Sequence, residues 1–157
     1  MPRIMKKYSH KKAVEFLNDQ FWHDSVLYEI RIIRTDPSDQ VIIPINLIIN
    51  EDDWESQKTT LIFNDCYYIE TKMHGGVAAM SDGEMISYAI AELESSFIDQ
   101  VIGSWAKTEM KLPKLFHFSL MLASTGSVIN IVCNSVSVEL ESTSGKHSAP
   151  LQIFPTR

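Results

Sequence analysis

The chain has 157 residues, 45% of them hydrophobic and 22% charged, which is typical of a single soluble globular domain spanning residues 1–157. No apolar run reaches the roughly 18 residues that a membrane-spanning helix needs, so we expect no membrane partner. The formal net charge is −6, and residues 13–157 carry 20 acidic against nine basic side chains, a balance that disfavours a nucleic-acid partner and favours a basic protein.

Residues 1–12 form a basic N-terminal segment that contains five Lys or Arg side chains and no acid. Neither an apolar core nor a small-residue cleavage site follows it, so the segment does not match a signal peptide and we expect a cytoplasmic protein. Ser9 and the apolar residues after it predict a short helix that begins near residue 10, with Ser9 as its N-cap.

The next segments predict strands. Alternating side chains over residues 25–33 and 41–50 indicate two of them, and residues 59–74 indicate a third, longer one. Pro44 has no N–H to donate to a sheet, so we expect its strand to lie at an edge or to be bulged there. A free edge can pair with a second copy of the chain, which makes a structural homodimer one alternative.

Residues 82–93 fit either a helix or an alternating strand, and we favour the strand. Ser95 and Ser96, with Asp99 three residues later, predict the start of an amphipathic helix. It ends before Pro113, which cannot continue a helix.

Two strand-like runs near the C-terminus are joined through S-T-G, and Gly126 can adopt positive φ, so they predict a β-hairpin. In the second run the apolar phase shifts near Asn134, which indicates either a bulge or a strand covered on both faces. Residues 142–157 are expected to form a flexible tail. Together the elements predict an α+β fold, with a mostly antiparallel sheet of about six strands and two short helices.

Neither the cysteines nor the histidines are spaced like a metal site. Cys66 and Cys133 lie in separate predicted strands without C-x-x-C or Cys/His spacing, so we expect buried free thiols. The five histidines show no i, i+4 pattern that would place two ligands on one face. We therefore expect no metal and no other cofactor.

Residues 21–25, F-W-H-D-S, precede the first predicted strand and contain an adjacent histidine and aspartate. An imidazole oriented by a carboxylate can act as a general base. The pocket candidates are Trp22, His23, Asp24 and His117. The sequence contains no G-x-S-x-G, phosphate loop or dinucleotide fingerprint, so catalysis is the less favoured interpretation. In the structural alternative, Asp24 or Ser25 holds the backbone while Phe21 and Trp22 enter the core.

An acidic loop is the candidate partner-binding surface. Its residues are Glu51, Asp52, Asp53, Trp54 and Glu55. Trp offers a large contact area and the carboxylates attract a basic partner, which is the composition of an interaction hot spot. The acids lack the D-x-D-x-D-G order of a calcium loop. The alternative is an ordinary solvated loop with Trp54 folded onto the end of the sheet.

Short motifs carry a resemblance over about residues 20–140. They are the aromatic-His-Asp-Ser opening at 21–25, the S-T-G-S hairpin at 124–127 and the serine-rich helix start at Ser95 and Ser96. In these features the chain resembles a loose group of small bacterial single-domain proteins of unknown function, some of them similar to immunity proteins that neutralise toxins. The resemblance implies a non-enzymatic, protein-binding role and supplies no catalytic residue.

These observations predict a non-enzymatic protein-binding domain, immunity-like, that neutralises a basic toxin through its acidic surface. The first alternative is a small enzyme or ligand-binding protein with a cleft near His23 and Asp24. The second is the structural homodimer.

Overall fold

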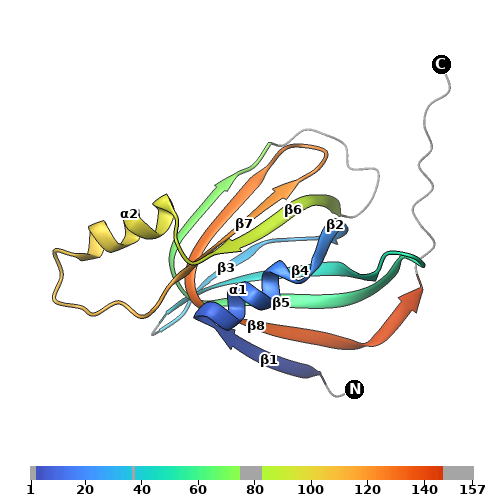
Figure 1. Cartoon of the computed structure of the whole chain (residues 1–157), viewed down its shortest axis with the longest axis horizontal. Coiled ribbons are helices and arrows are strands. Elements are labelled where there is room, and N and C mark those ends of the chain that lie inside the picture. Colours follow the sequence, from blue (N-terminus) through green and yellow to red (C-terminus); the bar gives the residue numbers. More distant parts are fainter. Residues whose placement is uncertain (1–2, 37, 75–82, 147–157) are drawn as a thin grey trace.

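The computed structural model describes residues 3–36, 38–74 and 83–146 (Figure 1). The elements in chain order are β1 (Ile4–Ser9), α1 (His10–Asn18), β2 (Phe21–Leu27), β3 (Arg31–Arg34), β4 (Asp39–Asn50), β5 (Glu55–Lys72), β6 (Glu84–Glu92), α2 (Ser96–Trp105), β7 (Phe116–Leu122) and β8 (Val128–Lys146). β8 therefore extends into the segment that the sequence predicts to be a flexible tail. Residues 147–157 of that segment lie outside the described part of the chain.

Six of the strands form a closed antiparallel barrel. Its order is β8-β5-β4-β2-β6-β7, and β7 pairs back onto β8 to close the ring. The remaining strands add to the ring at two places, β1 against residues 135–140 of β8 and β3 against β4. Strands make up more than half of the described residues.

The predicted α+β fold with a sheet of about six strands is therefore wrong, because the protein is mostly β and its sheet closes on itself. Closure depends on pairings between segments that are distant in the chain, and local alternation does not reveal them. The narrowest of these joints is the one between β2 and β6, where only Val26↔Met85 and Leu27↔Glu84 are in register.

The two longest strands bend where their pairing is irregular. β5 and β8 pair from Glu55↔Lys146 to Lys72↔Val128, with a register shift between Cys66 and Tyr68. Asp65, beside this shift, adopts a left-handed conformation with φ 51°. Such irregularities increase local twist and allow a long strand to follow a barrel wall.

The apolar phase shift predicted near Asn134 has a structural counterpart in β8. Ser135 and Ser137 are buried there, and so are Val136 and Val138, so both faces of the strand are covered in this region. Val136 and Val138 belong to the core cluster that α1 also enters, and on the other face the Asn64 side-chain amide donates to the Ser137 hydroxyl at 3.0 Å.

The core lies inside the barrel and extends to α1. Phe63, Phe116 and Phe118 are fully buried in it, and so are Ala13 and Leu17 of α1. Figure 1 shows α1 lying across the strands and α2 to one side of the barrel. α2 packs through Ile98 and Val101 against a second, smaller cluster that includes Val132 on the outside of the barrel.

Pro44 lies in an interior strand, which corrects the expectation of an edge. β4 pairs with β5 on one side and with β2 and β3 on the other. The Pro44 carbonyl accepts a hydrogen bond from the Tyr28 N–H at 3.3 Å, so the proline nitrogen faces the side where β2 has ended and β3 has not begun. The interruption removes the need for a proline N–H, and β4 offers no free edge for a homodimer.

Candidate functional site

The turn between β4 and β5 presents the acidic loop to solvent. Glu51, Asp52 and Asp53 are exposed, and Glu55 begins β5. The Asn50 side-chain oxygen accepts the Asp52 N–H at 3.0 Å and fixes the first part of the turn. The hairpin tip, residues 51–55, thus holds four carboxylates close together at one end of two barrel strands.

The side chain of Trp54 is exposed at the hairpin tip and its backbone is left-handed. Its side chain is 42% exposed, so the ring is not folded away onto the end of the sheet. Its backbone is left-handed, with φ 53°, a conformation that bulky residues rarely adopt and that is often found at functional sites. Ile49, which precedes the turn, is also exposed. The tip therefore offers an apolar contact surface inside an acidic environment.

The F-W-H-D-S segment forms an irregularity within β2. Its register against β4 shifts between Phe21 and Val26, and Asp24 is left-handed with φ 67°. Ser25 is buried and stabilises this bulge, because its hydroxyl donates to the Phe21 carbonyl at 2.9 Å and accepts the Ile48 N–H at 3.0 Å. The segment thus owes its conformation to a serine rather than to its histidine.

The pocket candidates of this segment point to different environments. Trp22 is buried and donates its indole N–H to the Leu17 carbonyl at 2.7 Å. The His23 side chain is 64% exposed, and its Nδ1 lies 3.0 Å from Oδ2 of Asp24. The histidine and aspartate therefore pair with each other at the surface of the bulge.

His117 occupies a separate, buried position on β7. It alternates with the core residue Phe118 and so faces the outside of the barrel, where the ring of Phe97 from α2 covers it at 4.8 Å between centroids. Its Nε2 lies 2.9 Å from Oδ1 of Asn130, and its Nδ1 lies 3.6 Å from Oε2 of Glu92, beyond hydrogen-bond distance. The contacts found for His117 include neither His23 nor Asp24, so the structure does not assemble them into one constellation.

The S-T-G-S motif is the turn between β7 and β8, and β6 holds it through Glu84. Oε1 of Glu84 accepts the hydroxyl of Ser124 at 2.6 Å and both the N–H and the hydroxyl of Thr125. Gly126 supplies the positive φ, 68°, that the turn requires. Burial raises the pKa of Glu84, but the hydrogen bonds from Ser124 and Thr125 outweigh it and the pKa is lowered. The motif therefore has a structural explanation.

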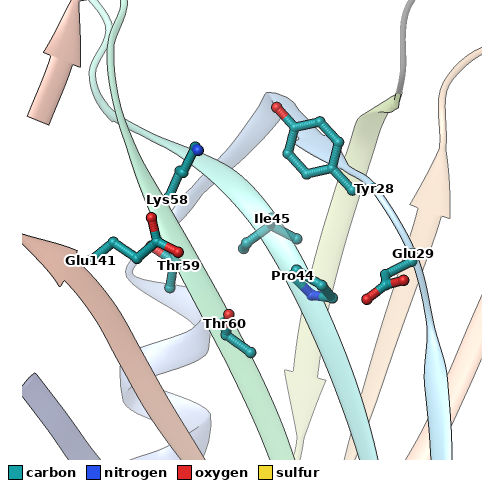
Figure 2. Close-up of a pocket in the computed structure, with 8 residues that line it drawn as sticks. All are labelled: Tyr28, Glu29, Pro44, Ile45, Lys58, Thr59, Thr60 and Glu141. Carbon is teal, nitrogen blue, oxygen red and sulfur yellow. The ribbon is translucent and has the colours of Figure 1, made fainter. Parts of the chain in front are cut away.

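A cavity of about 350 Å³ lies where two irregular pairings meet, and the sequence did not predict it. It is lined by Tyr28, Glu29, Pro44, Ile45, Lys58, Thr59, Thr60 and Glu141. Figure 2 shows Tyr28 and Glu29 on one side and Glu141 on the other, with residues of β4 and β5 between them. The β2–β3 interruption opens one wall, and a register shift between Gln57 and Thr59 opens the other. Pro44 within a strand was the only signal of it in the sequence.

The fold and these sites define a small closed antiparallel barrel with an exposed acidic hairpin tip and a surface cavity whose lining includes three charged side chains. No family model, no curated protein and no solved structure matches the chain. Within residues 3–36, 38–74 and 83–146, no three His, Cys, Asp or Glu side chains are grouped to hold a metal ion. Over the same residues, neither helix is long and apolar enough to cross a membrane.

Proposed function

We propose that the chain is a cytoplasmic, non-enzymatic protein-binding domain that binds a basic protein through its hairpin tip. The observation that carries this proposal is the exposed, left-handed Trp54 among four carboxylates. An exposed tryptophan costs little conformational entropy to immobilise and is enriched at interaction hot spots. A backbone strained at this residue places the ring at the tip of the turn.

The charge of the chain supports a basic rather than a nucleic-acid partner. Residues 13–157 carry a formal charge of −11 at neutral pH, which raises the encounter rate with cations and repels phosphates. The resemblance to immunity-like proteins suggests the kind of partner, a basic toxin or nuclease domain that the chain neutralises. The proposed role is thus inhibition by binding.

Calorimetry with the products of the genes that neighbour the gene of this chain tests the proposal. We expect binding that weakens as salt rises, because exposed charges are screened. We also expect an affinity loss of at least about tenfold in W54A, as for a central hot-spot residue.

The matched charge control compares D52N/D53N with E94Q/E109Q, which removes two exposed acids outside the hairpin tip. Both double variants lose the same formal charge. Weakened binding in D52N/D53N alone supports the hairpin tip, whereas equal losses indicate a general charge effect. Binding that changes with neither salt nor W54A contradicts the proposal.

A second candidate function is binding of a small ligand in the cavity beside Tyr28, rather than in a cleft at His23 and Asp24. Lys58 supplies a cation on its rim, and Glu29 and Glu141 supply carboxylates. A zwitterion such as a free amino acid complements these charges, and the volume suits a small ligand. Equilibrium dialysis against a mixture of the common amino acids tests this function, with retention lost in K58M. No retention by the unmodified chain contradicts it.

A further inference from the structure

The two cysteines of the chain are direct neighbours in the barrel. Cys66 on β5 and Cys133 on β8 are 67 positions apart in sequence, yet the strand register places them opposite each other. Both thiols are free in the structure. The expected free thiols are confirmed, with Cys133 buried and Cys66 half-buried, but their pairing across β5 and β8 could not be read from their spacing in the sequence.

Their positions suit a covalent bond between the sulfurs. Residues directly opposite in an antiparallel pair have Cβ atoms about 4.5–5.5 Å apart, close to the separation in a disulfide, so only a small shift is needed. A register shift follows Cys66 immediately, and Asp65 before it is left-handed. Such irregular pairing gives the strands room to make that shift.

We propose that Cys66 and Cys133 form a modification site, an intramolecular disulfide made by exchange with a low-molecular-weight disulfide. In the first step the Cys66 thiolate attacks one sulfur of the low-molecular-weight disulfide. The S–S bond of that oxidant breaks, one of its halves leaves as a thiol, and the other half forms a mixed disulfide with Cys66. In the second step the Cys133 thiolate attacks the Cys66 sulfur and releases the second thiol. The protein loses two protons and two electrons, and the oxidant is reduced to two thiols.

The order of the two steps follows from the surroundings of each sulfur. Cys66 is half-buried, and its Sγ lies 3.4 Å from the Phe63 carbonyl, whereas Cys133 is fully buried in the core. Burial raises the pKa of the Cys133 thiol well above its usual value, and the hydrogen bond with Cys66 raises it further. Cys133 is therefore the slow, resolving thiol, and closure accelerates as pH rises because more of it is thiolate.

In a reducing compartment the pair stays as two thiols until the oxidant concentration rises. The bond then ties β5 to β8 in the same irregular region that lets both strands bend. The disulfide is independent of the hairpin tip, which lies at the start of β5, whereas Cys66 is in the second half of that strand.

The experiment incubates the folded protein with oxidised glutathione and follows its intact mass. We expect a loss of about 2 Da, the mass of two hydrogens, and faster loss at higher pH. Peptide mapping without reductant should recover the segments of Cys66 and Cys133 as one linked species, and dithiothreitol should reverse the change. The variant C133S should instead stop at the mixed disulfide on Cys66, with a gain of about 305 Da.

The oxidised protein should also unfold at a temperature higher by about 5 °C or more, because the closed loop restricts the unfolded chain. An unchanged mass, stable glutathione adducts on the unmodified chain, or disulfide-linked dimers would overturn the proposal. The mass of the unmodified chain decides between these outcomes even if C133S fails to fold.

Discussion

The carboxylate of Glu84 accepts two hydrogen bonds from Thr125, one from its N–H at 2.9 Å and one from its hydroxyl at 2.8 Å. The same hydroxyl also lies 2.6 Å from that of Ser127, which accepts the His74 N–H at 3.0 Å. A chain of polar contacts thus runs from the end of β5 through the β7–β8 turn to the start of β6. It links three parts of the barrel wall.

The first prediction concerns the pH dependence of this contact. The folded-state pKa of Glu84 is lowered, so its contribution to stability is complete above the ordinary carboxyl range and is lost as pH falls through the lowered value. We expect E84Q to lower the free energy of unfolding by about 1–2 kcal/mol at neutral pH and to flatten its decline on acidification.

Urea unfolding monitored between about pH 7 and about pH 3 measures this effect. E94Q is the control, since Glu94 is exposed. A decline with pH as steep in E84Q as in the unmodified chain would show that Glu84 does not contribute to it.

The second prediction separates the structural from the catalytic interpretation of F-W-H-D-S. S25A removes the acceptor of the buried Ile48 N–H and one tie across the bulge, so we expect a loss of about 1–3 kcal/mol in unfolding free energy. H23A removes a largely exposed side chain and should change stability by less than about 0.5 kcal/mol. Chemical denaturation of both variants decides, and a reversed order of the two losses would contradict the serine's role.

The third prediction concerns the strain at Trp54. Glycine adopts a left-handed backbone without steric cost and alanine does not, so W54G should be more stable than W54A by about 1 kcal/mol. Both variants lack the indole and should lose partner binding alike. Thermal unfolding measures the difference in stability. Titration calorimetry with the partner measures the loss of binding. If W54A is as stable as W54G, the backbone at this position is not strained.

The fourth prediction concerns the narrow joint between β2 and β6. A Cβ at Gly83 would lie 2.5 Å from Cγ1 of Val26 and 2.8 Å from the Leu27 carbonyl, so G83A must displace the backbone there. We expect a loss of about 1–3 kcal/mol in unfolding free energy.

Gly103 provides the matched control, because a Cβ there meets nothing within 4 Å and the residue lies in α2. G103A should raise stability by about 0.5–1 kcal/mol through helix propensity. Urea unfolding of both variants is the measurement. If G83A leaves the free energy of unfolding unchanged, the pairing between β2 and β6 accommodates the added methyl group without loss of stability.

Local patterns predicted several elements correctly and failed where a partner strand was decisive. The strand over residues 82–93 and the helix after Ser95 are present as β6 and α2, and Ser95 caps α2 by accepting the Ile98 N–H. β1 was not predicted, since I-M-K-K-Y-S is basic and mostly exposed. It is a strand because β7 pairs with β8 only as far as Cys133, which leaves residues 135–140 of β8 free on that side to pair with β1.

The candidate sites divide in the same way. Four carboxylates and a tryptophan between two strands are visible in the sequence, but the exposure and left-handed backbone of Trp54 are not. The sequence likewise contains Pro44, yet the cavity beside it depends on where β2 stops and how β8 shifts against β5. The end of β2 and the shift of β8 are both set by how the strands pair with one another, which the local sequence does not show.

The sequence by itself determined the acidic charge, the strand-rich character, the second helix and the turn residues, because each follows from side chains close together in the chain. Tertiary structure alone decided that the sheet closes, that Pro44 is interior, that His117 and His23 are apart, and that Cys66 faces Cys133. The physical reason is that strand pairing joins residues of any separation. Its register is selected by the burial of whole faces, which no short segment contains.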